Sequence, residues 1–215
     1  MSTLKQRFLL VSDMHYTTDE KKLPVGKPSA AAGDAFGKTQ SEKVQKIYND
    51  IMRENGRSKL DAVLVLGDLS IDDYDFRNLP FNFCKKFKEE VMDRLPCPAY
   101  ALPGNHDSYT NDIWKDVMGY DRRYSVEIGE SVFIMDDSFG DVPANPKNPA
   151  SGSPFTPTDA KFLSAELEKH SGKRVFLCSH YFNCAKDDLS LSEECRALIE
   201  NSNDIALMFF GHTHK

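Results

Sequence analysis

The amino-acid sequence predicts an α/β protein whose β-sheets combine parallel and antiparallel strands. Short apolar runs alternate along the 215-residue chain with longer amphipathic segments, and this succession of strand, helix and strand is typical of α/β layering. One stretch departs from the succession, because residues 123–135 hold two strand-like runs around Gly129-Glu130 and so predict a β-hairpin. Mixed sheets are therefore expected.

The predicted strands are short runs of mainly apolar residues. Several of them are apolar at consecutive positions, as in Ala-Val-Leu-Val-Leu at residues 62–66, which is expected of strands that are covered on both faces. The predicted strands span residues 7–12, 62–66, 99–102, 123–128, 131–135, 174–179 and 205–210.

The predicted helices have apolar residues at helical spacing and polar residues at their ends. Thr158 predicts the start of one helix and Ser171-Gly172 its end. Ser192 is a predicted N-cap, followed by acidic residues that favour the first turn of a helix. The predicted helices span residues 41–54, 81–94, 158–170 and 192–200, and long loops at 16–39 and 139–157 are interpreted as insertions over a functional site.

Length and composition describe an ordinary globular chain. A hydrophobic fraction of 40% and a charged fraction of 28% exclude a largely disordered or coiled-coil protein. The length predicts one domain with loop insertions, or part of a larger domain. The net charge of −6 disfavours non-specific binding to nucleic acid.

Three further features predict a cytoplasmic protein outside the membrane. The apolar runs are too short to span a bilayer. The polar N-terminus leads directly into a predicted strand and has no signal-peptide pattern. The 5 cysteines form no CxxC pair, which indicates reduced thiols that pack as small hydrophobic residues.

Potential metal ligands gather just after the predicted strands. This is the edge at which ligand sites form in open α/β sheets. Taken singly, each of these residues is also typical of a turn, a cap or the surface. Five independent occurrences at equivalent strand ends, however, are not expected by chance. The residues in question are Asp13, His15, Asp68, Asn105, His106, His180, His212 and His214.

Two motifs are the most informative. In Gly104-Asn105-His106-Asp107, glycine permits a tight turn, the amide is a neutral ligand, His106 projects toward a substrate, and Asp107 is able to hold that imidazole. In Gly211-His212-Thr213-His214, two imidazoles lie on one side of an extended segment, a pattern suited to Mn, Fe or Zn. By contrast, His170 is expected to end a helix, and Asp136 and Asp137 to serve as turn or cap residues.

The ordered set D-x-H, G-D, G-N-H-D, H and G-H-x-H, from Asp13 to His214, resembles the calcineurin-like metallophosphoesterase superfamily. The resemblance implies one domain over residues 1–215, with the α/β (α+β) architecture of a four-layer αββα sandwich of mixed sheets. It also implies two divalent metal ions. Asp13, His15 and His214 would bind one ion. Asn105, His180 and His212 would bind the other, and Asp68 would bridge the two.

The resemblance further implies that His106 faces the scissile phosphate, where it helps to protonate the leaving group or stabilises negative charge, while Asp107 orients the His106 ring. Two neighbouring metal ions lower the pKa of a bridging water and hold the phosphoryl oxygens during in-line displacement. The expected substrate is a small phosphomonoester or phosphodiester. A catalytically silent binding scaffold on the same fold remains the alternative, and the net charge disfavours a DNA-processing nuclease.

The sequence also departs from parts of the superfamily. Gly67-Asp68 is followed by Leu69-Ser70, without the arginine that protein serine/threonine phosphatases use, which disfavours that branch. Residues 179–182, Ser-His-Tyr-Phe, differ from the H-H-x-P of many cyclic-nucleotide-type members. Members continue with further strands after G-H-x-H. We therefore expect either a C-terminally truncated domain with an exposed sheet edge, which is favoured, or a partner that supplies the missing layer.

Overall fold

The computed structural model describes residues 6–16, 40–70, 83–107, 109–139, 158–182 and 191–213. Nearly all of the two predicted insertion loops lies outside these ranges, and so does His214.

The first of two sheets is parallel. Its strands β1 (Phe8–Val11), β2 (Ala62–Leu66) and β3 (Ala99–Leu102) lie in that order, with Leu10 opposite Leu64 and Leu64 opposite Tyr100. Because all three strands run in one direction, their carboxyl ends meet at one edge of the sheet. That edge is where the sequence places its potential ligands.

The second sheet contains the predicted hairpin and is mixed. Its order is β4 (Tyr124–Ile128), β5 (Ser131–Asp136), β6 (Arg174–Ser179) and β7 (Ile205–Phe209). The pair β4–β5 is antiparallel, whereas β5–β6 and β6–β7 are parallel. Within the described residues, antiparallel pairing is therefore confined to this sheet.

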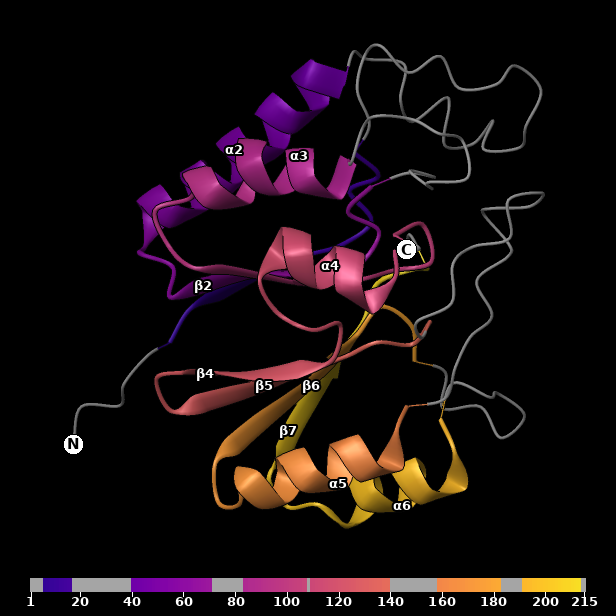
Figure 1. Ribbon diagram of the computed structural model, residues 1–215. Coiled ribbons are helices and arrows are strands. Elements are labelled where there is room, and N and C mark those ends of the chain that lie inside the picture. The colour runs from indigo at the N-terminus through magenta and orange to yellow at the C-terminus, as the bar shows by residue number, and fades with distance from the viewer. Residues whose placement is uncertain are drawn as a thin grey trace.

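The two sheets and their helices form the expected four layers, which confirms the αββα sandwich (Figure 1). Helices α2 (Gln40–Arg57) and α3 (Phe83–Glu90) cover the outer face of the first sheet, and α5 (Ala160–Lys169) and α6 (Glu193–Asn201) cover that of the second. A further helix, α4 (Asn111–Met118), packs Trp114 and Met118 into the same core as α2 and α3.

Alternation along the strands explains why both faces of each sheet are apolar. Successive side chains of a strand point to opposite faces. On β2, Val63 and Val65 pack under the helices, whereas Leu64 and Leu66 pack between the sheets. On β5, Phe133 faces the first sheet, and its neighbours on either side face α5 and α6. A consecutive apolar run is thus the correct signature of these strands.

The helix predictions were only partly correct. Residues 111–118 form α4, although the sequence predicted no helix there. The segment predicted as one helix over 81–94 is α3 followed by a single 3-10 turn, η2 (Met92–Arg94). The N-cap of α5 is Asp159 and not Thr158, because the Thr158 hydroxyl donates to Asp136 Oδ2 at 2.6 Å. The N-cap prediction for Ser192 is confirmed by its bond from Cys195 N.

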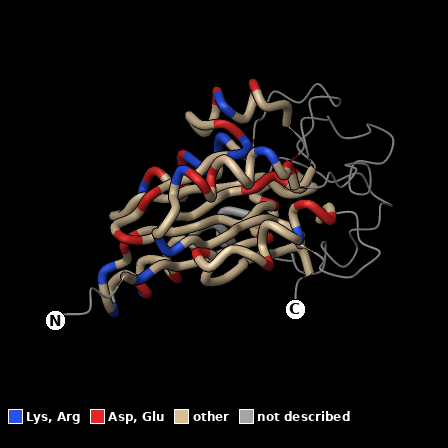
Figure 2. The backbone as a smooth tube through the Cα atoms, turned by 90° about the horizontal axis from the view of Figure 1, so that it is seen from below, with Lys and Arg blue, Asp and Glu red and all other residues tan. Residues whose placement is uncertain are grey.

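The outer surface combines charges of both signs with one apolar edge. Lysine, arginine, aspartate and glutamate are interspersed along the outer part of the described chain (Figure 2). Strand β7 is the last of the second sheet over the described ranges, and Leu207 and Phe210 are 56% and 50% exposed. None of the described helices is both long enough and apolar enough to cross a membrane.

Candidate metal centre

The segments that follow β1 and β2 run side by side beyond the sheet. Asp13 N donates to the Gly67 carbonyl at 3.0 Å, and His15 N donates to the Asp68 carbonyl at 2.8 Å. These bonds extend the parallel pairing past the last residues of the strands. They bring the D-x-H and G-D motifs, which lie more than fifty positions apart in the chain, into direct contact.

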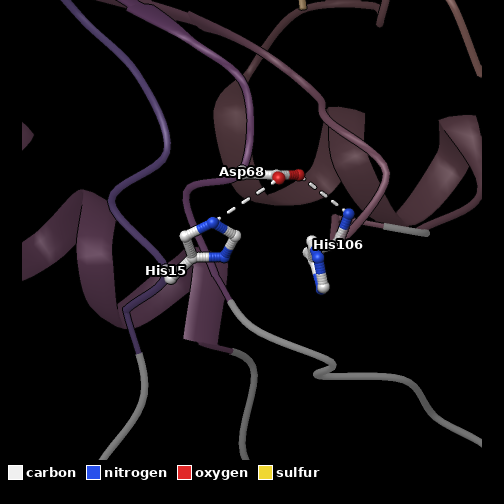
Figure 3. A group of neighbouring side chains, drawn as sticks. All are labelled: His15, Asp68 and His106. Carbon is white, nitrogen blue, oxygen red and sulfur yellow. Dashed lines mark hydrogen bonds and ion pairs between the residues drawn. The ribbon is translucent and has the colours of Figure 1, made fainter. Parts of the chain in front are cut away.

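Asp68 lies at the centre of the site and is buried. Its Oδ2 atom is 3.7 Å from His15 Nε2 and 3.3 Å from His180 Nε2. Its Oδ1 atom accepts a hydrogen bond from the main-chain N of His106 at 2.8 Å. Figure 3 shows this carboxylate between His15 and His106. One carboxylate therefore contacts groups from both sheets.

Among the described residues, two groups of side chains have the spacing of metal ligands, and they share Asp68. One is His15, Asp68 and His106, and the other is Asp68, His180 and His212. Within each group, the candidate ligand atoms lie within 4.8 Å of one another. The second group matches the resemblance, whereas the first includes His106, for which the resemblance implies no metal ligation.

The two remaining described candidates join the same constellation. Asn105 Oδ1 is 3.0 Å from His212 Nδ1. Asp13 Oδ2 accepts a bond from His212 N at 3.0 Å, and Asp13 Oδ1 lies 3.9 Å from His180 Nε2. The structure thus brings together every candidate ligand that it describes, while His214 lies outside the described residues.

In its neutral form, His180 has the tautomer that a metal ligand requires. Its Nδ1 atom lies 2.7 Å from the Leu66 carbonyl, which only accepts hydrogen bonds, so Nδ1 carries the proton. In the neutral ring, the lone pair is then on Nε2, which is buried and makes no hydrogen bond. A carbonyl that holds the outer nitrogen of a ligating histidine is a common feature of metal sites. A divalent cation fits this donor set.

The electrostatics of the constellation also favour a cation. Burial alone would lower the pKa of His180, but Asp68 and Asp13 outweigh burial and raise it to about 9. Burial would raise the pKa of Asp68, but the neighbouring imidazole of His180 above all, with His106 and His15, holds it below its usual range. The carboxylates of Asp68 and Asp13 therefore stabilise positive charge on or beside His180, as a proton or as a metal ion.

Glycine precedes three of the candidate ligands because each position is crowded. A Cβ atom on Gly67 would overlap the His180 ring, and one on Gly104 would overlap the Asp68 carboxylate and main chain. A Cβ atom on Gly211 would come within 2.8 Å of Asp13 Oδ2. The sequence predicted a tight turn at Gly104, but the packing of these glycines against the ligands was missed. The repeated glycine before a ligand was the available signal.

Comparison with known proteins agrees with this geometry. The sequence model of the calcineurin-like phosphoesterase family matches residues 6–215. The chain belongs to this family. It is thus a metal-dependent phosphoesterase, as its motifs predicted.

Two relatives illustrate how far the family likeness extends. The first is "Probable cyclic nucleotide phosphodiesterase" of Pseudoalteromonas sp. (strain SM9913), to which this chain is 23% identical over 216 residues. The matched region covers 97% of this chain and 71% of the relative. A solved dimetal phosphatase from Danio rerio has a TM-score of 0.61 at 14% identity, covering 96% of this chain and 81% of that one. The latter likeness concerns the fold.

Asp107 of the phosphoesterase has a position that the sequence did not indicate. Its Oδ2 atom accepts from Leu69 N at 2.9 Å and Gly104 N at 3.0 Å. Its Oδ1 atom accepts from the main-chain N and the hydroxyl of Ser70 at 2.8 and 2.9 Å. These bonds hold the loop that carries Asp68 against the turn that carries His106. The predicted orientation of the His106 ring by Asp107 stays a prediction.

Proposed function

We propose that the phosphoesterase hydrolyses phosphomonoesters or phosphodiesters of small molecules at two divalent metal ions that Asp68 bridges. The observation that supports this most directly is the pair of ligand groups that share the Asp68 carboxylate. When bound, two such ions polarise the phosphoryl oxygens and generate the nucleophile from water at neutral pH. Mn, Fe and Zn all suit the mixed carboxylate, amide and imidazole ligands.

The ligand assignment follows the family motifs, and the group Asp68, His180 and His212 agrees with it. Asp13 and His15, with His214, hold one ion in this proposal, and Asn105, His180 and His212 hold the other. The contact between His15 and Asp68 supports the first set, and that of His180 with Asp68 supports the second. The amide oxygen of Asn105 lies beside His212 and adds a neutral donor.

His106 is assigned to the leaving group. Its main-chain N is fixed by Asp68, its ring centroid lies 4.8 Å from that of His15, and its side chain is only partly buried. A partly exposed imidazole beside the ions is able to reach a bound ester and to donate a proton to the departing oxygen. A small substrate is favoured because the chain has a net charge of −6 and presents charges of both signs.

The test compares hydrolysis of 4-nitrophenyl phosphate and bis(4-nitrophenyl) phosphate by the Mn²⁺-loaded wild type, Asn105→Ala and His106→Ala. Cyclic nucleotides join the panel because a relative is named for them. His106→Ala should lower kcat by about 10²- to 10⁴-fold, the usual contribution of a general acid. Lys115→Met, at an exposed position of α4, is the control and should have wild-type activity. Equal activity in all four proteins would refute the assignment.

The binding-scaffold alternative predicts a different result. In its simplest form, a binding scaffold has lost the metal ions. Elemental analysis of the purified protein therefore distinguishes the scaffold hypothesis from the enzyme hypothesis. About two metal ions per chain together with turnover of any ester in the panel supports the enzyme. Two bound ions without turnover of any ester would favour a scaffold that keeps the metals.

A further inference from the structure

Arg122 and Asp137 form a buried ion pair. Arg122 Nε lies 2.9 Å from Asp137 Oδ2, and Arg122 Nη2 lies 3.2 Å from Asp137 Oδ1, so the pair is bidentate. The two residues are 3% and 2% exposed. Arg122 lies just before β4 and Asp137 just after β5, at the end of the hairpin nearest the site.

The guanidinium also reaches across to the chain that leaves the first sheet. Arg122 Nη1 donates to the carbonyl of Tyr109, and the main-chain N of Arg122 donates to Asn111 Oδ1 at 3.1 Å. Tyr109 N in turn donates to the carbonyl of Asp107 at 2.7 Å. The arginine is therefore bonded to the segment that directly follows Asn105-His106.

The carboxylate reaches the other half of the site. Asp137 Oδ1 accepts a bond from Phe139 N at 2.9 Å, and the Phe139 ring centroid is 5.7 Å from that of His180. Ser138, which lies between Asp137 and Phe139 in the chain, donates its hydroxyl to the Tyr181 carbonyl at 2.9 Å. The segment after β5 thus packs directly on the segment that carries His180.

Stability alone is a poor explanation for such a pair. Removing two charges from water costs several kcal/mol per ion, and apolar residues of similar size often replace a buried pair without loss of stability. An arginine fork, however, is rigid and binds several acceptors at fixed angles. Here it joins Asp137 to the Tyr109 carbonyl, and so fixes one sheet end relative to the other.

We propose that Arg122 and Asp137 are positioning residues that set the separation between Asn105-His106 on one side and His180 on the other. This inference rests on the proposed function, since it assumes that these groups bind metal and substrate together. Neither residue is a metal ligand in the proposal. Their effect is to align ligands that come from different sheets.

The experiment uses the double variant Arg122→Met/Asp137→Asn. It removes both buried charges, so no unpaired ion is left, and the amide oxygen introduced by Asp137→Asn still offers an acceptor to Phe139 N. Binding of Mn²⁺ to the metal-free protein is measured by calorimetry, and thermal unfolding is followed without metal. We expect unfolding within about 5 °C of the wild type, but the weaker Mn²⁺ site should lose about 10- to 100-fold in affinity.

The matched control is Lys115→Met/Asp121→Asn, which removes an exposed ion pair of the same region (Lys115 Nζ to Asp121 Oδ1, 3.0 Å) and should keep wild-type Mn²⁺ binding. A double variant that folds and binds Mn²⁺ like the wild type would overturn the inference. If the double variant does not fold, Arg122→Lys, which keeps the charge and loses the fork, must show the same weakened binding. A wild type that binds no Mn²⁺ would overturn the proposed function as well.

Discussion

Replacement of Asp107 by asparagine should destabilise the metal-free phosphoesterase. Five hydrogen bonds converge on the buried carboxylate. Oδ2 accepts from Leu69 N and Gly104 N, and Oδ1 accepts from Ser70 N, the Ser70 hydroxyl and the Cys84 thiol. Asparagine keeps one acceptor oxygen and places an NH2 group at the other position. At the position of Oδ2 this group leaves Leu69 N and Gly104 N without an acceptor, and at that of Oδ1 it leaves Ser70 N without one, since the Ser70 hydroxyl is able to rotate and accept. Two buried donors without an acceptor cost about 2 to 6 kcal/mol together, at 1 to 3 kcal/mol each.

Part of this cost is offset, because burial and the charge of Asp68 raise the pKa of Asp107 and so oppose the ionised carboxylate. We therefore expect Asp107→Asn to lower the free energy of unfolding by about 1 to 4 kcal/mol. The assay is urea unfolding at pH 7.5 in the presence of a chelator. Asp121→Asn, at an exposed ion pair, is the control. An unfolding free energy for Asp107→Asn equal to that of the control would refute the reasoning.

Three other perturbations have expected outcomes. Gly104→Ala should abolish tight Mn²⁺ binding, measured by calorimetry, because the added Cβ would displace Asp68. The control is Gly56→Ala, where the added Cβ meets open space. This control should bind Mn²⁺ normally and gain up to about 1 kcal/mol in the free energy of unfolding. Burial raises the pKa of Asp136 to about 6 despite Arg123. The favourable contribution of the protonated Asp136 carboxyl to the free energy of unfolding is therefore complete at low pH and is lost as the pH rises from about 4 to 6. Wild type should thus lose up to about 3 kcal/mol relative to Asp136→Asn over that range in urea unfolding, and a constant difference would contradict the burial argument. Mn²⁺ at about 100 times its Kd should stabilise the metal-free protein by about 2.7 kcal/mol in thermal unfolding, and no shift would contradict metal binding to the native state.

The strands were predictable because their burial leaves a direct mark on the sequence. All residues of β2 are buried, and its consecutive apolar residues predicted a strand at the observed positions. Helix α4 was not predicted, because it is only eight residues long and half of them are polar or acidic. Its end signals were nevertheless present. The hydroxyl of Thr110 accepts from Ile113 N, and Gly119 ends the helix with a φ of 85°.

The candidate ligands were predictable for a related reason, since each lies immediately after a strand and parallel strands end at one edge. The groups that support them were not. Asp107 binds main-chain donors up to 38 positions away, and Arg122 pairs with Asp137 across the hairpin. Such contacts follow from the three-dimensional path of the chain and have no periodicity. Asp137 was interpreted as a turn residue, and its bond from Phe139 N agrees with that interpretation, but its ion pair was not foreseen.

Backbone strain shows how completely the surrounding fold determines the site. Among the described residues, positive φ angles at non-glycine positions occur at Asp13, His15, Asp68 and His212, which are 56°, 46°, 51° and 69°. Each such angle costs about 1 kcal/mol or more, and persists only where neighbouring interactions outweigh it. The bonds of His212 N to Asp13 and of His106 N to Asp68 supply part of that compensation. Protein contacts therefore contribute to the arrangement of the candidate ligands. We expect the chain to keep its fold when metal is removed, because three buried apolar clusters stabilise it, in contrast to small domains whose metal supplies the folding energy.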